Sequence, residues 1–366
     1  MRLPRLRLWH GLIAASLAWG LGVHAAALSV QPLSHRMDVS TVQKFPFVQS
    51  ENTRLAARIN QWLFLKTFEI PAPARMADGL RGVDAQTWQN MPELGYTVLR
   101  NDARVLSLRI EGEGCGAYCE NFTYAHAFDA ATGRHLEAAD LFTSQGLQAI
   151  ARKIGANNAA TLRKEIASLQ KAKKAPQPKD GPSADGLDAV IGLYEDCLSS
   201  RGDIEYRRIA GVGRMEIEAG SVLFAQDRCS NHAMRALDDI GDFSTRIPAS
   251  QLGPWLTGYG RRLLLGEGSA LAPTSPFGQV LHGTIDGKLP ITLRLPLIGG
   301  GDGQVNAVYF YDRYRTPIPV SGQYKDGVLT LEEGESKARL RLKSEGLALR
   351  GEWTSGQKTL PMVLAP

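Results

Sequence analysis

The chain has 366 residues, of which 43% are hydrophobic and 22% are charged, and its formal net charge at pH 7 is +5. This composition is that of a globular protein and excludes a largely disordered or collagen-like chain. Residues 1–27 contain three arginines and no lysine or acidic residue, so the rest of the chain carries a net charge of only +2. Such a weak charge gives no reason to expect nucleic acid as a partner.

The first 27 residues have the layout of a secretory signal peptide. Arg2, Arg5 and Arg7 precede an apolar run over residues 11–23, and alanines follow at 25–27. This order is typical of a cleavable export signal, and the apolar run is too short to span a bilayer. We therefore predict a mature chain without a membrane span, located in the periplasm or secreted. An uncleaved N-terminal anchor is the alternative.

The chain has four cysteines. In an oxidising compartment an even number of cysteines favours disulfides over free thiols or a metal site. Three pairings are possible, and the glycines on either side of the first cysteine favour a short bridged loop. We expect bridges between Cys115 and Cys119 and between Cys197 and Cys229. No two histidines lie near these cysteines at zinc-ligand spacing, so we predict no metal and no cofactor.

Residues 28–265 are predicted to form an α+β domain. An extended segment over 34–48 leads to Ser50, which is expected to cap a helix with apolar residues at helical spacing. Three segments rich in β-branched and aromatic residues are expected to be strands, at 94–100, 103–112 and 121–128. A second helix is expected after Ser144. The Lys- and Pro-rich stretch 171–186 is expected to be a loop, followed by a short helix and a hairpin.

A Gly- and Pro-containing stretch over residues 266–276 is predicted to be a linker. After it, residues 277–366 accommodate eight short β-segments separated by turn dipeptides such as Asp286-Gly287 and Asp326-Gly327. We therefore predict an all-β domain, an eight-stranded meander barrel whose closure removes exposed strand edges. A two-sheet sandwich is the alternative.

The stretch 105–143 contains a series of short motifs with a defined order and spacing: Gly116-Ala117-Tyr118, Phe128-Asp129, Thr132-Gly133 and Asp140-Leu141-Phe142. It resembles a bacterial extracytoplasmic domain family of unknown function. That family occurs in the lysozyme-sensing anti-sigma factor and beside some peptidoglycan deacetylase domains. The likeness covers residues 40–262. Tyr118 stands where the family usually has histidine.

The resemblance implies a non-catalytic binding or interaction protein of the cell envelope, with peptidoglycan glycan or an envelope protein, such as a lysozyme-like protein, as its partner. The sequence contains no motif of a nucleophile elbow, a metalloprotease or a dinucleotide loop, so no catalytic residue is predicted. The candidate binding residues are Tyr118, Glu120, His126, Asp129, Tyr309 and Tyr311.

Two other functions remain open from the sequence. A hydrolase acting on envelope polymer would require His126, Asp129 and a third polar group within hydrogen-bond reach of one another. A lipocalin-like carrier of a small ligand would require an empty, apolar barrel interior. Tyr309 and Tyr311 are two residues apart on a strand and are expected to share one face.

Overall fold

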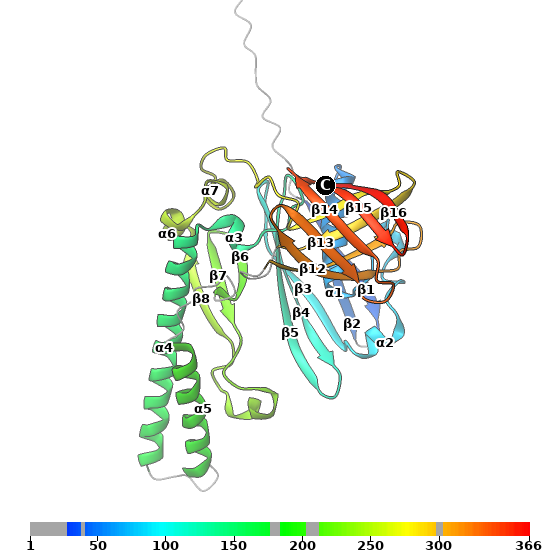
Figure 1. Ribbon diagram of the computed structural model, residues 1–366. Helices are drawn as coiled ribbons and strands as arrows, with labels where there is room; N and C mark the ends of the chain where they lie inside the picture. The colour runs from blue at the N-terminus through cyan, green and yellow to red at the C-terminus, as the bar shows by residue number, and fades with distance from the viewer. Residues whose placement is uncertain (1–27, 38–40, 176–183, 203–211, 298–302) are drawn as a thin grey trace, which may run out of the picture.

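The computed structural model describes residues 28–37, 41–175, 184–202, 212–297 and 303–366 (Figure 1). It confirms an α+β N-terminal region followed by a closed eight-stranded antiparallel meander barrel, and the sandwich alternative is wrong. The predicted signal peptide, residues 1–27, lies outside the described residues. None of the described helices is long and apolar enough to cross a membrane.

The chain begins with an antiparallel hairpin of β1 (Ser29–Arg36) and β2 (Val42–Gln49). Helix α1 (Thr53–Thr67) follows and is capped by Asn52, whose side chain accepts a hydrogen bond from the Leu55 amide. An Asn oxygen at this position satisfies one of the free amides of the first turn. The cap is therefore two residues later than the predicted Ser50. A short helix, α2 (Ala85–Gln89), precedes the first three-stranded sheet.

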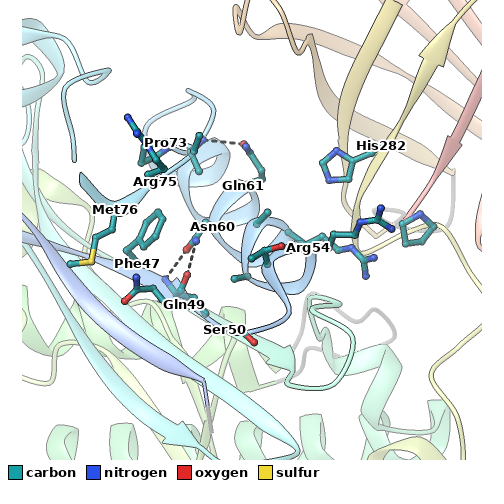
Figure 2. A pocket seen from close by; sticks show the side chains of 18 of the residues that line it. Phe47, Gln49, Ser50, Arg54, Asn60, Gln61, Pro73, Arg75, Met76 and His282 are labelled. Carbon is teal, nitrogen blue, oxygen red and sulfur yellow. Dashed lines mark hydrogen bonds between the residues drawn. The ribbon is translucent and has the colours of Figure 1, made fainter. Parts of the chain in front are cut away.

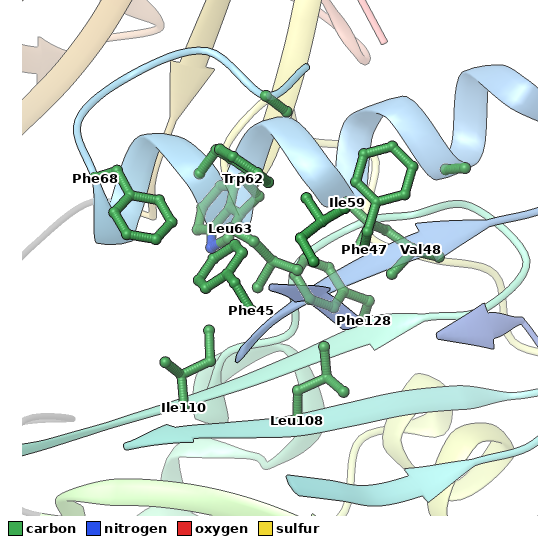
Figure 3. Packing of buried hydrophobic residues seen from close by; sticks show 14 of the residues in the cluster. Phe45, Phe47, Val48, Ile59, Trp62, Leu63, Phe68, Leu108, Ile110 and Phe128 are labelled. Atoms are coloured by element: carbon green, nitrogen blue, oxygen red, sulfur yellow. The ribbon is translucent and has the colours of Figure 1, made fainter. Parts of the chain in front are cut away.

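That sheet consists of β3 (Glu93–Asn101), β4 (Val105–Cys115) and β5 (Cys119–Asp129), in this order. All three extend beyond the predicted strands 94–100, 103–112 and 121–128 toward the disulfide loop, and β4 begins two residues later than predicted. Helix α1 packs its apolar face on the sheet and the first hairpin, as Figure 3 shows. Figure 3 labels these core residues: Phe45, Phe47, Val48, Ile59, Trp62, Leu63, Phe68, Leu108, Ile110 and Phe128.

Strand β4 is buried on both faces at its start, because a second core lies on the opposite side. Leu106 and Leu108 face the α1 core, whereas Val105 belongs to the second core. The second core gathers side chains of these elements: α3 (Ala138–Leu141), α4 (Ser144–Lys174), β6 (Arg214–Glu218), β7 (Ser221–Gln226), β8 (Phe243–Pro248), α6 (Ala249–Leu252) and α7 (Gly258–Leu265).

Helices α4 and α5 (Ala184–Gly202) form a long hairpin that projects away from the rest of the molecule (Figure 1). Residues 176–183 of the predicted loop 171–186 lie outside the described residues, whereas α4 continues to Lys174 and α5 begins at Ala184, so both ends of that segment are helical. Part of the reason is that Lys173 pairs with Asp188 of α5, at 2.5 Å. A small apolar core holds the two helices together and contains Leu162, Ile191 and Tyr194.

The barrel follows chain order around its wall and closes by pairing its last strand with its first. Its strands are β9 (Gln279–Ile285), β10 (Leu289–Leu295), β11 (Gln304–Tyr311), β12 (Ile318–Lys325), β13 (Val328–Glu333), β14 (Arg339–Glu345), β15 (Ala348–Ser355) and β16 (Lys358–Ala365). Asp286 and Gly287 both have positive φ, as a two-residue hairpin turn requires.

The barrel lies against α1 and the first sheet. Val280 of β9 belongs to the α1 core, and the His135 amide donates to the Gly278 carbonyl at 3.1 Å. The predicted linker is also held, because Arg134 Nη1 donates to the Ser275 carbonyl at 3.0 Å. The division of the chain into two domains at residues 266–276 stays a prediction.

Candidate functional site, a basic cleft beside helix α1

A cleft of about 860 Å³ opens where the N-terminal half of α1, the end of β2, the segment 72–76 and one end of the barrel meet (Figure 2). Volumes of this size are typical of small-molecule sites. The barrel contributes His282 from β9, Arg315 after β11, and the last two residues of the chain. The cleft is thus built from segments far apart in the sequence.

The side chains that line the cleft include four arginines and no aspartate or glutamate. Arg75 forms an exposed ion pair with Asp78, and Arg315 donates to the Ala72 carbonyl. Arg58 Nη1 donates to the Thr132 carbonyl at 2.8 Å. Arg54 is exposed and has no hydrogen-bond or ion-pair partner among the described residues.

The electrostatics of the cleft favour an anion. Burial lowers the pKa of the Arg58 guanidinium, and the positive charge of Arg54 lowers it further. Helix α1 begins at this place without an acidic residue in its first turn, so the partial positive charge of its N-terminus is not compensated within that turn. A negatively charged ligand would relieve the repulsion between the two arginines.

Hydrogen bonds fix the walls of the cleft, as the dashed lines in Figure 2 show. The Asn60 side chain binds both the amide and the carbonyl of Val48, each at 2.8 Å. Gln61 Oε1 accepts from the Ala72 amide at 3.0 Å, which ties the segment 72–76 to α1. Small and apolar side chains lie between the arginines and form a surface for an apolar part of a ligand: Ala56, Ala57, Pro73, Ala74 and Met76.

His282 supplies a further polar group at the barrel end of the cleft. Its Nδ1 lies 3.0 Å from Thr292 Oγ1, and that hydroxyl donates to Asp312 at 2.7 Å. Burial lowers the pKa of His282; Asp312 opposes this effect, and Arg58 and Arg54 add to it. The other ring nitrogen, Nε2, has no partner among the described residues. It is therefore available to a ligand.

Of the predicted binding residues, Tyr118 and Glu120 lie together at the disulfide loop, away from this cleft. The Tyr118 ring stacks on His232, with a centroid distance of 3.7 Å. Glu120 accepts from His232 Nδ1 at 2.7 Å and forms an ion pair with Arg228, and these two hydrogen bonds lower the pKa of Glu120. Glu120 therefore connects the loop to the segment around Cys229.

Two disulfides are present, Cys115–Cys119 and Cys197–Cys229, which is the predicted pairing. The bridge at Cys197 ties α5 to the segment after β7. Glu113 lies near the sulfurs of Cys115 and Cys119 at a spacing that could hold a metal ion. Because both cysteines are oxidised, neither offers a thiolate ligand.

His126 is buried beside His135 instead of Asp129. Its Nδ1 lies 3.3 Å from His135 Nε2, and His135 Nδ1 lies 3.2 Å from Glu137 Oε1. This row borders a second cleft, of about 520 Å³. Burial lowers the pKa of His126 well below its ordinary value, and the charges of His135, Lys66 and Arg294 add to that effect. His126 is therefore neutral at pH 7.

Asp129 connects the end of β5 to α7. It is fully buried and accepts hydrogen bonds from the Ala131 amide, the Tyr259 hydroxyl and Arg262. These bonds satisfy its carboxylate within the protein. The structure therefore does not bring His126 and Asp129 together as a hydrolase would require.

Tyr309 and Tyr311 share one face of β11, as predicted, and their ring centroids are 5.8 Å apart. Tyr309 is fully buried and donates to Glu333, to which Trp353 Nε1 also donates at 3.4 Å. Tyr309 is thus closed off from a ligand. The barrel interior is filled with apolar side chains: Leu281, Ile285, Ile291, Leu293, Leu329, Leu331, Leu340, Leu342, Leu349, Met362 and Leu364.

The sequence did not point to the cleft residues Arg54, Arg58, Arg75, His282 and Arg315. The one local signal was the pair Arg54 and Arg58, one helical turn apart at a helix start without acidic residues. The remaining three come from distant segments. No local motif relates them.

Fold and site together define an α+β protein with a disulfide-bridged hairpin, a C-terminal meander barrel and a basic cleft between helix α1 and the barrel. No family model matches the chain, and no curated protein matches its sequence. The chain is similar in structure to proteins of the DUF3298 family, a bacterial family of unknown function. The specific likeness to the domains of the anti-sigma factor and the deacetylases stays a prediction.

Two solved DUF3298-family structures are similar to it. One, from Bacteroides fragilis, is 15% identical, with a TM-score of 0.40, and the match covers 67% of this chain and 100% of that one. The other, from Pseudomonas aeruginosa, is 11% identical, with a TM-score of 0.36, and the match covers 64% of this chain and 95% of that one. At these values the likenesses carry no argument about function.

Proposed function

We propose that this is a non-catalytic protein of the periplasm or the cell exterior that binds an anionic component of the cell envelope in the basic cleft. One observation carries the proposal: four arginines and a histidine line the cleft without any acidic side chain. The absence of aspartate and glutamate side chains from the lining favours an anionic ligand over a basic protein partner. The apolar surface between the arginines suits a ligand with both apolar and charged groups.

An extracytoplasmic location is supported by the two disulfides and by the export-type N-terminus of the sequence. Disulfides persist where thiols are oxidised, and they are rare in the cytosol. The resemblance seen in the sequence implies peptidoglycan as a partner, and the carboxylates of its fragments are opposite in charge to the arginines of the cleft. These fragments are the ligands we propose for the cleft.

The two alternative functions have less support. The hydrolase hypothesis loses its predicted pair, because Asp129 bonds to Tyr259 and Arg262 and not to His126. The carrier hypothesis needs a hollow barrel, and the interior of this one is closely packed.

The test is equilibrium binding of soluble peptidoglycan fragments to the purified protein by calorimetry. We expect binding that weakens with added salt, and a loss of at least tenfold in affinity on Arg54→Glu, because the charge reversal places a carboxylate beside the anion. Arg54 has no partner to lose, so the substitution should leave the fold intact.

Arg341→Glu is the matched control. Arg341 is an exposed arginine of β14 that does not line the cleft and has no ion pair among the described residues. The substitution changes the net charge equally and should leave the affinity unchanged. Absence of any binding, or an equal loss with both variants, would contradict the proposal. Inorganic phosphate, used as a competitor, distinguishes a general anion site from one that requires the carboxylate-bearing fragment.

A further inference from the structure

Helix α4 carries a second basic surface, which is independent of the cleft. Six exposed basic side chains lie along it: Arg152, Lys153, Arg163, Lys164, Lys171 and Lys174. At 3.6 residues per turn, they fall within an arc of about 120° around the helix axis. From the first to the last, the row is about 33 Å long at a rise of 1.5 Å per residue. We call this row the α4 stripe.

No acidic residue interrupts the α4 stripe. Glu165 is the acidic residue of α4, and it points about 100° away from the nearest edge of the arc. The other exposed positions within the arc are alanines or glutamines, such as Ala156, Ala160 and Ala167. None of the six basic side chains forms an ion pair with a described residue. Their positive charges are therefore uncompensated by contacts within the described structure.

The position of the α4 stripe makes it accessible. The α4–α5 hairpin projects from the body of the protein, and α4 forms the outer edge of the molecule in Figure 1. The apolar residues of α4, among them Ile154, Leu162 and Ile166, are buried on the opposite side. The side chain of Lys173 lies outside the arc and is the lysine that pairs with α5.

We propose that the α4 stripe docks the protein on a membrane surface that contains anionic lipid headgroups. Small alanine side chains lie between the basic residues of the arc, so the basic groups can all approach one flat layer of anionic headgroups. Each basic residue near that layer adds to the attraction. The arc contains no aromatic residue, which single-stranded nucleic acids and sugars use for stacking. It also contains no large apolar residue, so the contact is electrostatic and does not insert into the bilayer.

The test is co-sedimentation of the purified protein, as isolated from cells, with vesicles of phosphatidylcholine alone or mixed with phosphatidylglycerol. We expect binding to the mixed vesicles at low salt, little binding to phosphatidylcholine, and release at high salt because the charges are screened. Reversal of two central charges, Arg163→Glu with Lys164→Glu, should weaken the partition at least roughly tenfold.

The matched control is Arg341→Glu with Lys343→Glu, which makes the same change in net charge on the exposed face of β14. It should keep wild-type binding. Circular dichroism checks that both variants are folded. Absence of binding to the anionic vesicles would overturn the proposal, as would an equal loss in both variants. Soluble polyphosphate that binds as tightly as the vesicles would show a general polyanion site and would also overturn it.

Discussion

The hydroxyl of Tyr259 donates a 2.6 Å hydrogen bond to the buried carboxylate of Asp129, 130 residues earlier in the chain. Burial raises the pKa of Tyr259 well above its ordinary value, and the charge of Asp129 raises it further. Together with Arg262, this contact ties α7 to the end of β5. The motif residue Asp129 therefore stabilises the junction between the first three-stranded sheet and α7.

Asp129→Ala should destabilise the protein by about 3 kcal/mol or more, because it leaves the Arg262 guanidinium and the Tyr259 hydroxyl without their acceptor. Tyr259→Phe should cost less, about 1–2 kcal/mol, since the carboxylate keeps Arg262 and the Ala131 amide. Urea unfolding measures both changes. A smaller loss for Asp129→Ala than for Tyr259→Phe would show that Asp129 does not hold this junction.

His126 should make the protein more stable at neutral pH than at mildly acidic pH. Its pKa in the folded protein lies well below the ordinary value near 6.5, so between these two values only the unfolded chain binds the proton. Stability therefore rises with pH through that window and is complete above pH 6.5. The limiting slope is about 1.4 kcal/mol per pH unit.

The measurement compares urea unfolding of the wild type and His126→Gln at several pH values between 5 and 7.5. The variant should have a smaller slope of unfolding free energy against pH, whatever its stability at pH 7.5. Since the charge of Lys66 helps to lower the pKa of His126, Lys66→Gln should raise that pKa and narrow the pH window in which the slope is seen. Equal slopes for wild type and His126→Gln would rule out this effect of His126.

The two disulfides should differ in their contribution to stability. In the chain-entropy model a bridge stabilises more as the loop it closes becomes longer. The separation is 32 residues for Cys197–Cys229 and 4 for Cys115–Cys119, which gives about 3–4 and about 2 kcal/mol, respectively. Thermal unfolding of the two double-serine variants measures the order. The prediction fails if removal of the shorter bridge costs more.

Two glycines in helices should respond oppositely to alanine. A Cβ on Gly260 of α7 would lie 2.1 Å from the Leu141 carbonyl oxygen, so Gly260→Ala must push α7 away from α3. Gly192 of α5 has no atom within 4 Å of such a Cβ. Gly192→Ala should stabilise by about 0.5–1 kcal/mol, because alanine favours the helix. Chemical unfolding of both variants checks the contrast in sign.

Much of the fold followed from local sequence signals. The turn dipeptides at residues 286 and 326 predicted the barrel strands, because hairpin turns depend on near neighbours. The end of α4 was predicted less well. Its last turn is rich in lysine, and a contact with α5 fixes it.

The candidate sites were predicted less well than the fold. The motif around Asp129 identified a residue with many contacts, but these contacts are with Tyr259 and Arg262, which no local pattern connects to it. His126 was a candidate on the strength of its neighbour Asp129 in sequence. In the structure the neighbour of the His126 ring is His135. An isolated β-bridge between Phe128 and His135 brings the two histidines together.

By itself, the sequence determined the order of the elements and the positions of the hairpin turns in the barrel, because these depend on residues close together in the chain. It left other cysteine pairings and a sandwich open, because the Cys197–Cys229 bridge and the pairing of β16 with β9 join residues far apart in the chain. Only the tertiary structure decided where charge accumulates without compensation. Arg54 and His282 line one cleft because α1 packs against β9, and such a meeting depends on the complementary shapes of two cores rather than on any spacing along the chain.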